Sequence, residues 1–261
     1  MKPNPPRKRF GQNFLHDGNI IERILTSLAP APGDHFVEIG PGQGAITRPL
    51  SERVQRLEVI EIDRDLAAAL AASEWANAIT IHQGDALKFD FAALTAAPGS
   101  LRLVGNLPYN ISTPLLFHIL ESHHLFRDLH VMLQKEVVQR MTAAPGSKTY
   151  GRLTVALAAR CSVESLFVIR PGSFFPAPKV DSAFARLTPL PQPLISAEHS
   201  DIFDTVVRNA FSQRRKQLGN ALSNVLTPEQ IIATDIDPKA RAENLDVTDF
   251  VRLAIAATKY C

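Results

Sequence analysis

The stretch VGNLPYNIS (104–112) closes an apolar run with residues that could carry out chemistry. The preceding residues, LRLVG, have the composition of a buried strand, and Asn106 and Pro108 end that strand abruptly. Asn106 offers a side-chain carbonyl oxygen, the Leu107 main-chain carbonyl comes free where the strand stops, and Tyr109 offers a flat aromatic face.

This set of groups suits an amino group carried on a flat base. The exocyclic amine of adenine is a poor nucleophile because its lone pair is delocalised, and the base must be unpaired or flipped out to expose it. Two acceptors can turn the lone pair out of the ring plane, and Tyr109 can stack on the base, which is worth about 1–3 kcal/mol. Methylation of such a nitrogen depends on alignment for in-line attack rather than on a strong base. The alternative is an Asn-x-Pro turn in which Tyr109 only packs.

A glycine-rich turn, EIGPGQGAIT (38–47), follows the first strand-like run. Gly40, Gly42 and Gly44 alternate there, and glycine permits positive φ and close approach of a ligand. In a doubly wound sheet, the carboxyl end of the first strand is where a nucleotide-like ligand binds. The spacing also fits Gly-x-Gly-x-x-Ala, ending at Ala45, so the turn alone leaves NAD and S-adenosylmethionine open as ligands.

Acids end the next two strand-like runs. Glu61 follows the first glycine by about twenty residues, where a carboxylate can accept both hydroxyls of a ribose. Asp85 ends the third run, where it can accept a hydrogen bond from an adenine amine. Both could instead be acids favoured at helix N-termini by the helix dipole. Two acids at successive strand ends beside the glycine turn favour a nucleoside ligand, and the Asn106 motif favours methyl transfer over hydride transfer.

The elements that must position these residues alternate along the chain. Helix-like stretches, including TPLLFHILES (113–122), separate the strand-like runs, which fall at 34–40, 56–63, 78–85, 101–106 and 129–136. This alternation predicts an α/β fold, a doubly wound and mostly parallel sheet with helices on both faces. Two later strand-like runs (161–171 and 180–190), joined by a Pro-rich loop, predict an antiparallel pair at the edge of the sheet.

A Pro-rich segment, PLPQPLIS (189–196), has the composition of a linker. Beyond it, residues 199–261 contain no strand-like run and suggest several short helices. We therefore predict an α/β domain over 1–192 and a small all-α domain over 193–261.

Composition narrows the class of protein. Among 261 residues, 45% are hydrophobic, yet no apolar run is long enough to predict a membrane span. The basic start MKPNPPRKRF has no apolar stretch after it and does not predict a secretory signal. Cys161 and Cys261 suggest neither a disulfide framework nor a zinc site. We expect a cytoplasmic protein without a metal.

The net charge is only +2, but the basic residues are clustered. No acid lies between Arg208 and Asn220, and the cations in that interval are Arg208, Arg214, Arg215 and Lys216. If the segment is helical, three of them project within about 100° of one another, as phosphate contacts would require. The alternative is an ordinary solvated face.

Taken together, the motifs resemble the bacterial ribosomal RNA adenine dimethyltransferases, from about residue 8 to about residue 220. The segments that carry the resemblance are FGQNFL (10–15), EIGPGQGAIT (38–47), VIEID (59–63), GDAL (84–87), NLPYNIST (106–113), FFPAPKVDS (174–182) and NAFSQRRKQL (209–218). The resemblance implies a methyltransferase-type sheet. It also implies S-adenosylmethionine as cofactor and two adjacent adenines near the 3′ end of small-subunit (16S) rRNA as substrate, converted to N6,N6-dimethyladenosine.

The same resemblance implies roles for individual residues. It places the cofactor against Asn13, Leu15, Gly40, Glu61, Asp85 and Asn106. It places the target adenine between Tyr109 and Phe175, beside Pro108, with its amine held by Asn106 and the Leu107 carbonyl. Leu107 stands where many singly methylating DNA enzymes have proline, which favours the dimethylating branch. The alternatives are a hydrophobic staple for FGQNFL and ordinary loop packing for Phe175.

The implied partner is the small ribosomal subunit, bound through its 16S rRNA by the Arg208–Lys216 cluster, and we expect a monomer with no membrane contact. Three other functions remain open from the sequence: a DNA adenine methyltransferase, an RNA-binding assembly factor with an inactive site, and an NAD-dependent dehydrogenase. A DNA enzyme usually has a larger recognition region than the C-terminal residues provide. A dehydrogenase predicts no role for Asn106.

Overall fold

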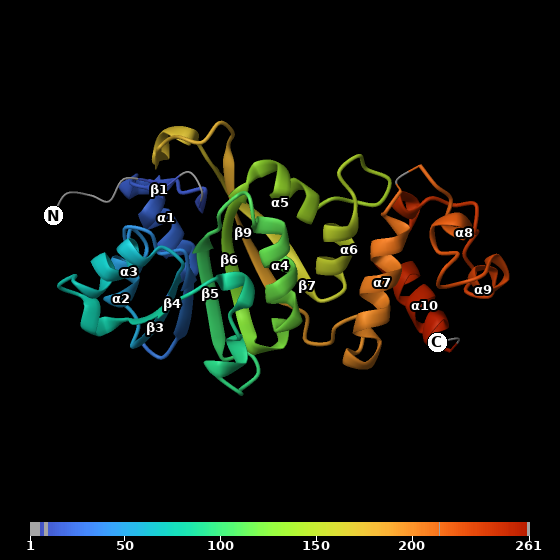
Figure 1. The fold of residues 1–261 in the computed structure, drawn as a ribbon, viewed down its shortest axis with the longest axis horizontal. Coiled ribbons are helices and arrows are strands. Elements are labelled where there is room, and N and C mark those ends of the chain that lie inside the picture. Colours follow the sequence, from blue (N-terminus) through green and yellow to red (C-terminus); the bar gives the residue numbers. More distant parts are fainter. Residues whose placement is uncertain (1–5, 8–9, 214, 260–261) are drawn as a thin grey trace. The chain divides into compact units, whose positions relative to one another are not determined.

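The computed structural model describes residues 6–7, 10–213 and 215–259 (Figure 1). The chain forms two compact units. The first comprises the chain up to Val138 together with Glu164–Thr188, and the second comprises Gln139–Val163 and the chain from Pro189 onward. The chain passes from the first unit to the second after Thr188, close to the predicted boundary at residue 192. The assignment of residues 139–163 to the second unit was not predicted.

A seven-stranded sheet has the order β4-β3-β2-β5-β6-β9-β7. Its strands are β2 (His35–Ile39), β3 (Arg56–Glu61), β4 (Thr80–Gln83), β5 (Leu101–Asn106), β6 (Phe126–Gln134), β7 (Cys161–Ile169) and β9 (Ser182–Pro189). Strands β2 to β6 pair in parallel, and β9 pairs antiparallel with β6. The predicted parallel sheet with a late antiparallel extension is therefore confirmed.

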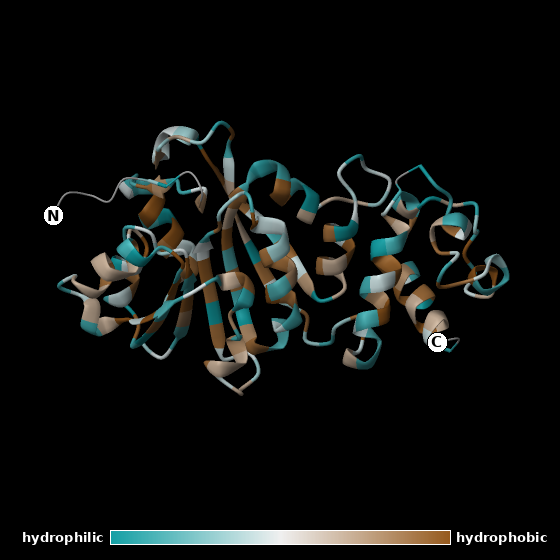
Figure 2. Cartoon of the chain, viewed as in Figure 1, coloured by the Kyte–Doolittle hydropathy of each residue, from teal (hydrophilic) through white to brown (hydrophobic). Residues whose placement is uncertain are grey.

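Strand β2 is where the order of the sheet reverses. It pairs on one side with β3 and on the other with β5, so successive crossovers leave it in opposite directions. All of β2 is buried, as is β5 up to Gly105, and Figure 2 shows polar bands between the apolar ones along the strands of this sheet. In open α/β sheets, ligands bind at the carboxyl ends of the strands beside such a switch point.

Two helices of the first unit begin at polar caps and bury one side. Helix α1 (Gly18–Leu28) starts at Asp17, whose carboxylate accepts from the amides of Asn19 and Ile20. Helix α3 (Arg64–Ala71) starts at Asp63 in the same way. The remaining helices are α2 (Thr47–Ser51), α4 (Ser112–Glu121) and α5 (Lys135–Met141).

A second sheet has only two strands, β1 (Phe14–Leu15) and β8 (Phe174–Phe175), and neither was predicted. They pair antiparallel, with Phe14 opposite Phe175. The Ser173 hydroxyl donates to Asp17 (2.9 Å), which fixes the same loop to the start of α1. The N-terminal segment and the late Pro-rich loop are thus joined within the first unit.

The second unit contains α6 (Arg152–Ala158), α7 (Ser200–Ala210), α8 (Leu218–Ala221), α9 (Pro228–Ile232) and α10 (Val247–Thr258). Its core includes Phe203, Val206, Phe250 and Leu253. Beyond Pro189, the described residues form helices and turns without a strand, as predicted. None of the described helices is long and apolar enough to cross a membrane.

Candidate active site

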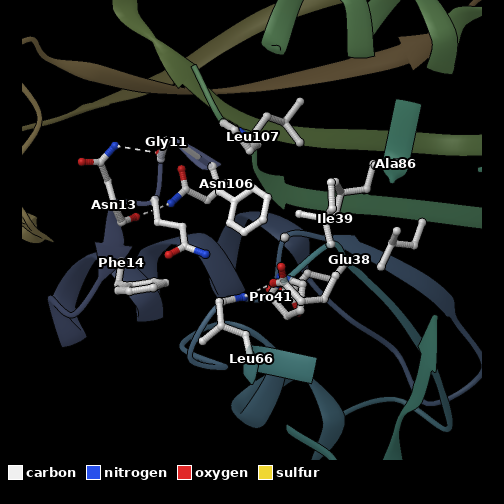
Figure 3. A pocket seen from close by; sticks show the side chains of 18 of the residues that line it. Gly11, Asn13, Phe14, Glu38, Ile39, Pro41, Leu66, Ala86, Asn106 and Leu107 are labelled. Carbon is white, nitrogen blue, oxygen red and sulfur yellow. Dashed lines mark hydrogen bonds between the residues drawn. The ribbon is translucent and has the colours of Figure 1, made fainter. Parts of the chain in front are cut away.

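A pocket opens at the carboxyl ends of the central strands, in the first unit (Figure 3). About 940 Å³ of space lies between its walls, and this space includes open solvent. Its walls are residues 10–15, the glycine turn after β2, the ends of β3 and β4, and residues 106–109. Five of the motifs that the sequence singled out, at 10–15, 38–47, 59–63, 84–87 and 106–113, therefore converge on one cavity, whereas no described residue of 174–182 or 209–218 lines it.

Asn106 lies at the end of β5 with its side-chain amide oriented by the N-terminal segment. Its Nδ2 donates to the Asn13 carbonyl at 2.9 Å, and the Asn13 side chain donates to the Gly11 carbonyl at 3.2 Å (Figure 3). With Nδ2 fixed in this way, Oδ1 is the atom left to accept a hydrogen bond. Asn106 thus brings an amide oxygen that can accept a hydrogen bond to the wall of the pocket.

Glu61 is 4% exposed at the end of β3 and accepts two main-chain hydrogen bonds. Its Oε2 accepts from Gly42 (3.2 Å) and its Oε1 from Asp63 (2.9 Å). Burial raises the pKa of Glu61, although these amides oppose the effect. Asp63, not Glu61, caps α3, so Glu61 is not a helix-terminal acid and its carboxylate faces the pocket.

Sequence reasoning missed Glu38, which lies inside β2 and also lines the pocket. It is 2% exposed, and its Oε2 has no hydrogen-bond partner among the described residues. Burial raises the pKa of Glu38 to about 8, and nearby Glu61 adds a smaller effect in the same direction. The signal that could have found it is an acid two positions before Gly40, within an otherwise apolar strand.

Asp85 and Gly40 also line the pocket, whereas Gly44 does not. The Asp85 carboxylate accepts from the Leu87 amide (3.0 Å) and caps a short 3₁₀ helix. Asp85 is therefore also an acid at a helix N-terminus, the alternative that the sequence left open. A Cβ at Gly44 would lie 2.8 Å from the Trp75 ring. The third glycine of the turn therefore makes room for the Trp75 ring rather than for a ligand.

Asn13 and Leu15, which the resemblance assigns to the cofactor site, both line the pocket. Leu15 is 7% exposed and belongs to the core of the first unit. FGQNFL therefore contributes a ligand-facing segment and packing together, which goes beyond a hydrophobic staple for α1.

Leu107, Pro108 and Tyr109 line the pocket, but Phe175 is not among its lining residues. The Tyr109 hydroxyl is hydrogen-bonded to Ser182, and burial raises the pKa of Tyr109. Phe175 is 64% exposed on β8, opposite Phe14, which does line the pocket. Its exposed ring is available to a large ligand such as RNA.

The basic cluster departs from the predicted helix. Helix α7 ends at Ala210, and Arg215 and Lys216 lie in an exposed turn before α8. The run after Phe211 is polar and has no apolar stripe to bury, and the Ser212 hydroxyl donates to the Asn209 carbonyl (2.7 Å). The predicted common helix face for Arg208, Arg215 and Lys216 is therefore wrong. Arg214 lies outside the described residues.

The pocket discriminates between ligand charges. Two buried acids, Glu38 and Glu61, face it, and no Lys or Arg is found among its described lining residues. The described lining residues therefore offer no cationic side chain to the anionic pyrophosphate of a dinucleotide. A nucleoside that carries a positive charge fits the same groups.

Comparisons with known proteins agree with this arrangement. Residues 4–259 match the family model described as "Ribosomal RNA adenine dimethylase". The chain is 51% identical over 253 residues to Ribosomal RNA small subunit methyltransferase A of Acidithiobacillus ferrooxidans, covering 97% of this chain and 95% of that one. It is 52% identical over 249 residues to the protein of the same name from Pseudomonas aeruginosa, covering 95% and 93%.

Solved structures of similar fold include a dimethyladenosine transferase from Plasmodium falciparum, with a TM-score of 0.76, 28% identity, and coverage of 94% of this chain and 98% of that one. The 23S rRNA methyltransferase ErmE, at 24% identity, has a TM-score of 0.71 over 94% and 100% of the two chains and supports the fold. The family match over nearly the whole sequence confirms the resemblance found in the motifs, and the chain belongs to the ribosomal RNA adenine dimethylase family.

Proposed function

We propose that this protein uses S-adenosylmethionine to convert two adjacent adenines near the 3′ end of 16S rRNA to N6,N6-dimethyladenosine, late in the assembly of the small ribosomal subunit in the bacterial cytoplasm. The observation that carries the proposal is the oriented Asn106 amide beside an acid-lined nucleoside pocket. The chain's membership of the family and the names of its relatives support the substrate.

When bound, S-adenosylmethionine supplies an electrophilic methyl group on a sulfonium. Glu61 accepts the ribose hydroxyls, Asp85 accepts from the adenine amine, and Gly40 leaves room beside the Asn106 main chain. A Cβ at Gly40 would already lie 3.6 Å from the Asn106 carbonyl oxygen. Asn13 and Leu15 cover the same site from the N-terminal segment. Glu38 offers the unpartnered carboxyl oxygen to the positive end of the cofactor.

The target adenine stacks on Tyr109, with Phe175 covering its other face. Asn106 Oδ1 and the Leu107 carbonyl accept the two N–H groups and turn the nitrogen lone pair toward the methyl group. After transfer, the nitrogen is cationic and releases a proton readily, so no strong base is needed. The monomethylated amine keeps one N–H, so one acceptor still holds it for the second transfer.

RNA contact is assigned to the second part of the chain. Within the proposed helical domain 193–261, Arg208, Arg215 and Lys216 are exposed, and cations of this kind suit phosphates without specifying sequence. Arg214 adds a further charge to the same stretch. We assign residues 1–192 to the methyltransferase domain and expect the protein to act as a monomer.

The test is transfer of radiolabelled methyl groups to small subunits that lack the modification, followed by nuclease digestion to identify the product base. We expect N6,N6-dimethyladenosine from two adjacent positions and no labelling of duplex DNA. Labelled duplex DNA would favour the DNA methyltransferase instead, and subunit binding without transfer would favour an inactive assembly factor. Glu61→Ala is the matched control, since loss of the ribose acceptor should weaken cofactor binding while the protein remains folded.

A further inference from the structure

Asp63 receives more partners than a helix cap requires. It is 2% exposed, and its Oδ1 accepts from the Asp65 amide (3.0 Å), which is the capping bond of α3. The same carboxylate also accepts from Arg7 Nη1 (2.9 Å) and from Gln12 Nε2 (3.1 Å). Besides capping α3, Asp63 therefore holds Arg7 and Gln12 of the N-terminal segment.

The two residues of the N-terminal segment also hold each other. The Arg7 main-chain amide donates to Gln12 Oε1 at 2.7 Å, while the Arg7 guanidinium contacts Asp65 as well as Asp63. Gln12 thus uses its amide nitrogen on Asp63 and its amide oxygen on Arg7. A guanidinium and an amide as partners offset the desolvation penalty of a buried carboxylate. Removal of one partner leaves more of that penalty uncompensated.

Asp63 connects this contact to the cofactor site. Its main-chain amide donates to Glu61 Oε1 (2.9 Å), so Asp63 holds the Glu61 carboxylate and the N-terminal segment at once. On the other side, Gln12 is followed directly by Asn13, whose carbonyl accepts from Asn106. Residues 10–15 form one wall of the pocket between these two attachments.

We propose that Arg7, Gln12 and Asp63 form a latch that seats residues 10–15 against the cofactor and, through Asn13, orients Asn106 toward the target amine. The latch residues are positioning residues and touch neither ligand's reacting atoms. The inference rests on the proposed function, because it takes S-adenosylmethionine as the ligand that the segment covers.

Loss of the latch should affect binding and chemistry together. Arg7→Gln removes the charge on the partner of a buried carboxylate, and we expect the Kd for S-adenosylmethionine to rise about tenfold. Gln12→Ala should raise it less. At saturating cofactor, the single-turnover methyl-transfer rate should also fall in both variants, because Asn106 loses its orientation. Arg7→Lys should recover part of the affinity, since it restores the charge without the planar fork.

The experiment measures S-adenosylmethionine affinity by calorimetry and single-turnover transfer for the wild type, Arg7→Gln, Asp63→Asn and the double variant. Arg48→Gln, which breaks the exposed Arg48–Glu52 pair elsewhere in the first unit, is the control and should match the wild type. If Arg7 and Asp63 act through one contact, their effects on Kd will be less than additive. Thermal unfolding without cofactor checks that the variants are folded.

A wild type that does not bind S-adenosylmethionine would overturn the cofactor assignment rather than the latch. A wild type that binds, together with an unchanged Kd in Arg7→Gln or fully additive effects in the double variant, would overturn the latch. Arg7→Gln, which leaves the cap of α3 in place and changes a residue that does not line the pocket, decides the matter if Asp63→Asn does not fold.

Discussion

The side-chain amide of Asn106 donates to the main-chain carbonyl of Asn13, a residue 93 positions earlier in the chain. The bond joins the residue proposed to hold the target amine to the segment proposed to cover the cofactor. It also fixes the orientation of the Asn106 side-chain amide: Nδ2 donates to Asn13, and Oδ1 is left to accept a hydrogen bond from another group.

Asn106→Ala removes an acceptor that matters most as positive charge develops on the target nitrogen. We expect the single-turnover methyl-transfer rate to fall by about 10²–10³, the range found when one positioned hydrogen-bonding group is removed from a polar transition state. Transfer to undermethylated small subunits at saturating cofactor measures it. A rate within a few-fold of the wild type would contradict the role of Asn106.

Tyr109 separates the contribution of its ring from that of its hydroxyl. Tyr109→Phe keeps the stacking face and loses only the hydrogen bond to Ser182, so most activity should remain. Tyr109→Ala should lose about 1–3 kcal/mol of stacking. Ser182→Ala, measured in the same transfer assay, should reproduce Tyr109→Phe. If Tyr109→Phe is as impaired as Tyr109→Ala, the hydroxyl is the working group.

Glu38 makes stability depend on pH. Burial raises its pKa from 4.5 to about 8, so the folded protein holds a proton that the unfolded chain releases between these values. Below about pH 4.5 both states are protonated. From there to about pH 8 the free energy of unfolding of the cofactor-free protein should fall as pH rises, by at most about 1.4 kcal/mol per pH unit from this group.

Urea denaturation of the wild type and Glu38→Gln between pH 5 and pH 9 measures this effect. Glutamine stays neutral throughout, so the stability of the wild type relative to the variant should decline up to about pH 8 and then level off. Glu61 is present in both proteins, and its own titration largely cancels in the difference. Parallel pH profiles would show that Glu38 does not titrate in this way.

The basic cluster predicts a salt effect. Replacement of Arg214, Arg215 and Lys216 by Gln should weaken binding to the small subunit and reduce the slope of log affinity against log salt by roughly 0.7–0.9 for each phosphate that the protein no longer neutralises. Cofactor affinity should not change. Filter binding at several salt concentrations measures the slope, and a slope equal to that of the wild type would exclude the cluster as an RNA-binding surface.

Long elements with a clear pattern could be predicted from the sequence. The runs that became β2, β3 and β5 are rich in apolar residues and almost wholly buried, and an acid ends β3 and an amide ends β5. Because the carboxyl ends of parallel strands share one edge, the predicted order was enough to bring Glu61 and Asn106 to the same pocket.

What could not be predicted depends on distant partners. Strands β1 and β8 have two residues each, too few to show a period, and exist because they pair with each other. The Tyr109–Ser182 contact is likewise invisible until the sheet is folded. Glu38 was passed over because an acid inside an apolar strand has no local signature of function. The end of α7 was missed because charge alone does not show where a helix loses its buried face.

The pairing of Phe14 with Phe175 joins a wall of the pocket to an exposed loop, which we propose to contact cofactor and RNA respectively. If two ligands both contact the β1–β8 pair, the binding of one is thermodynamically linked to the binding of the other. If bound cofactor changes the affinity for RNA by some factor, then bound RNA must change the affinity for cofactor by the same factor. Under the proposed function, this linkage predicts that exchange of spent for fresh cofactor between the two methylations depends on whether the subunit is still bound.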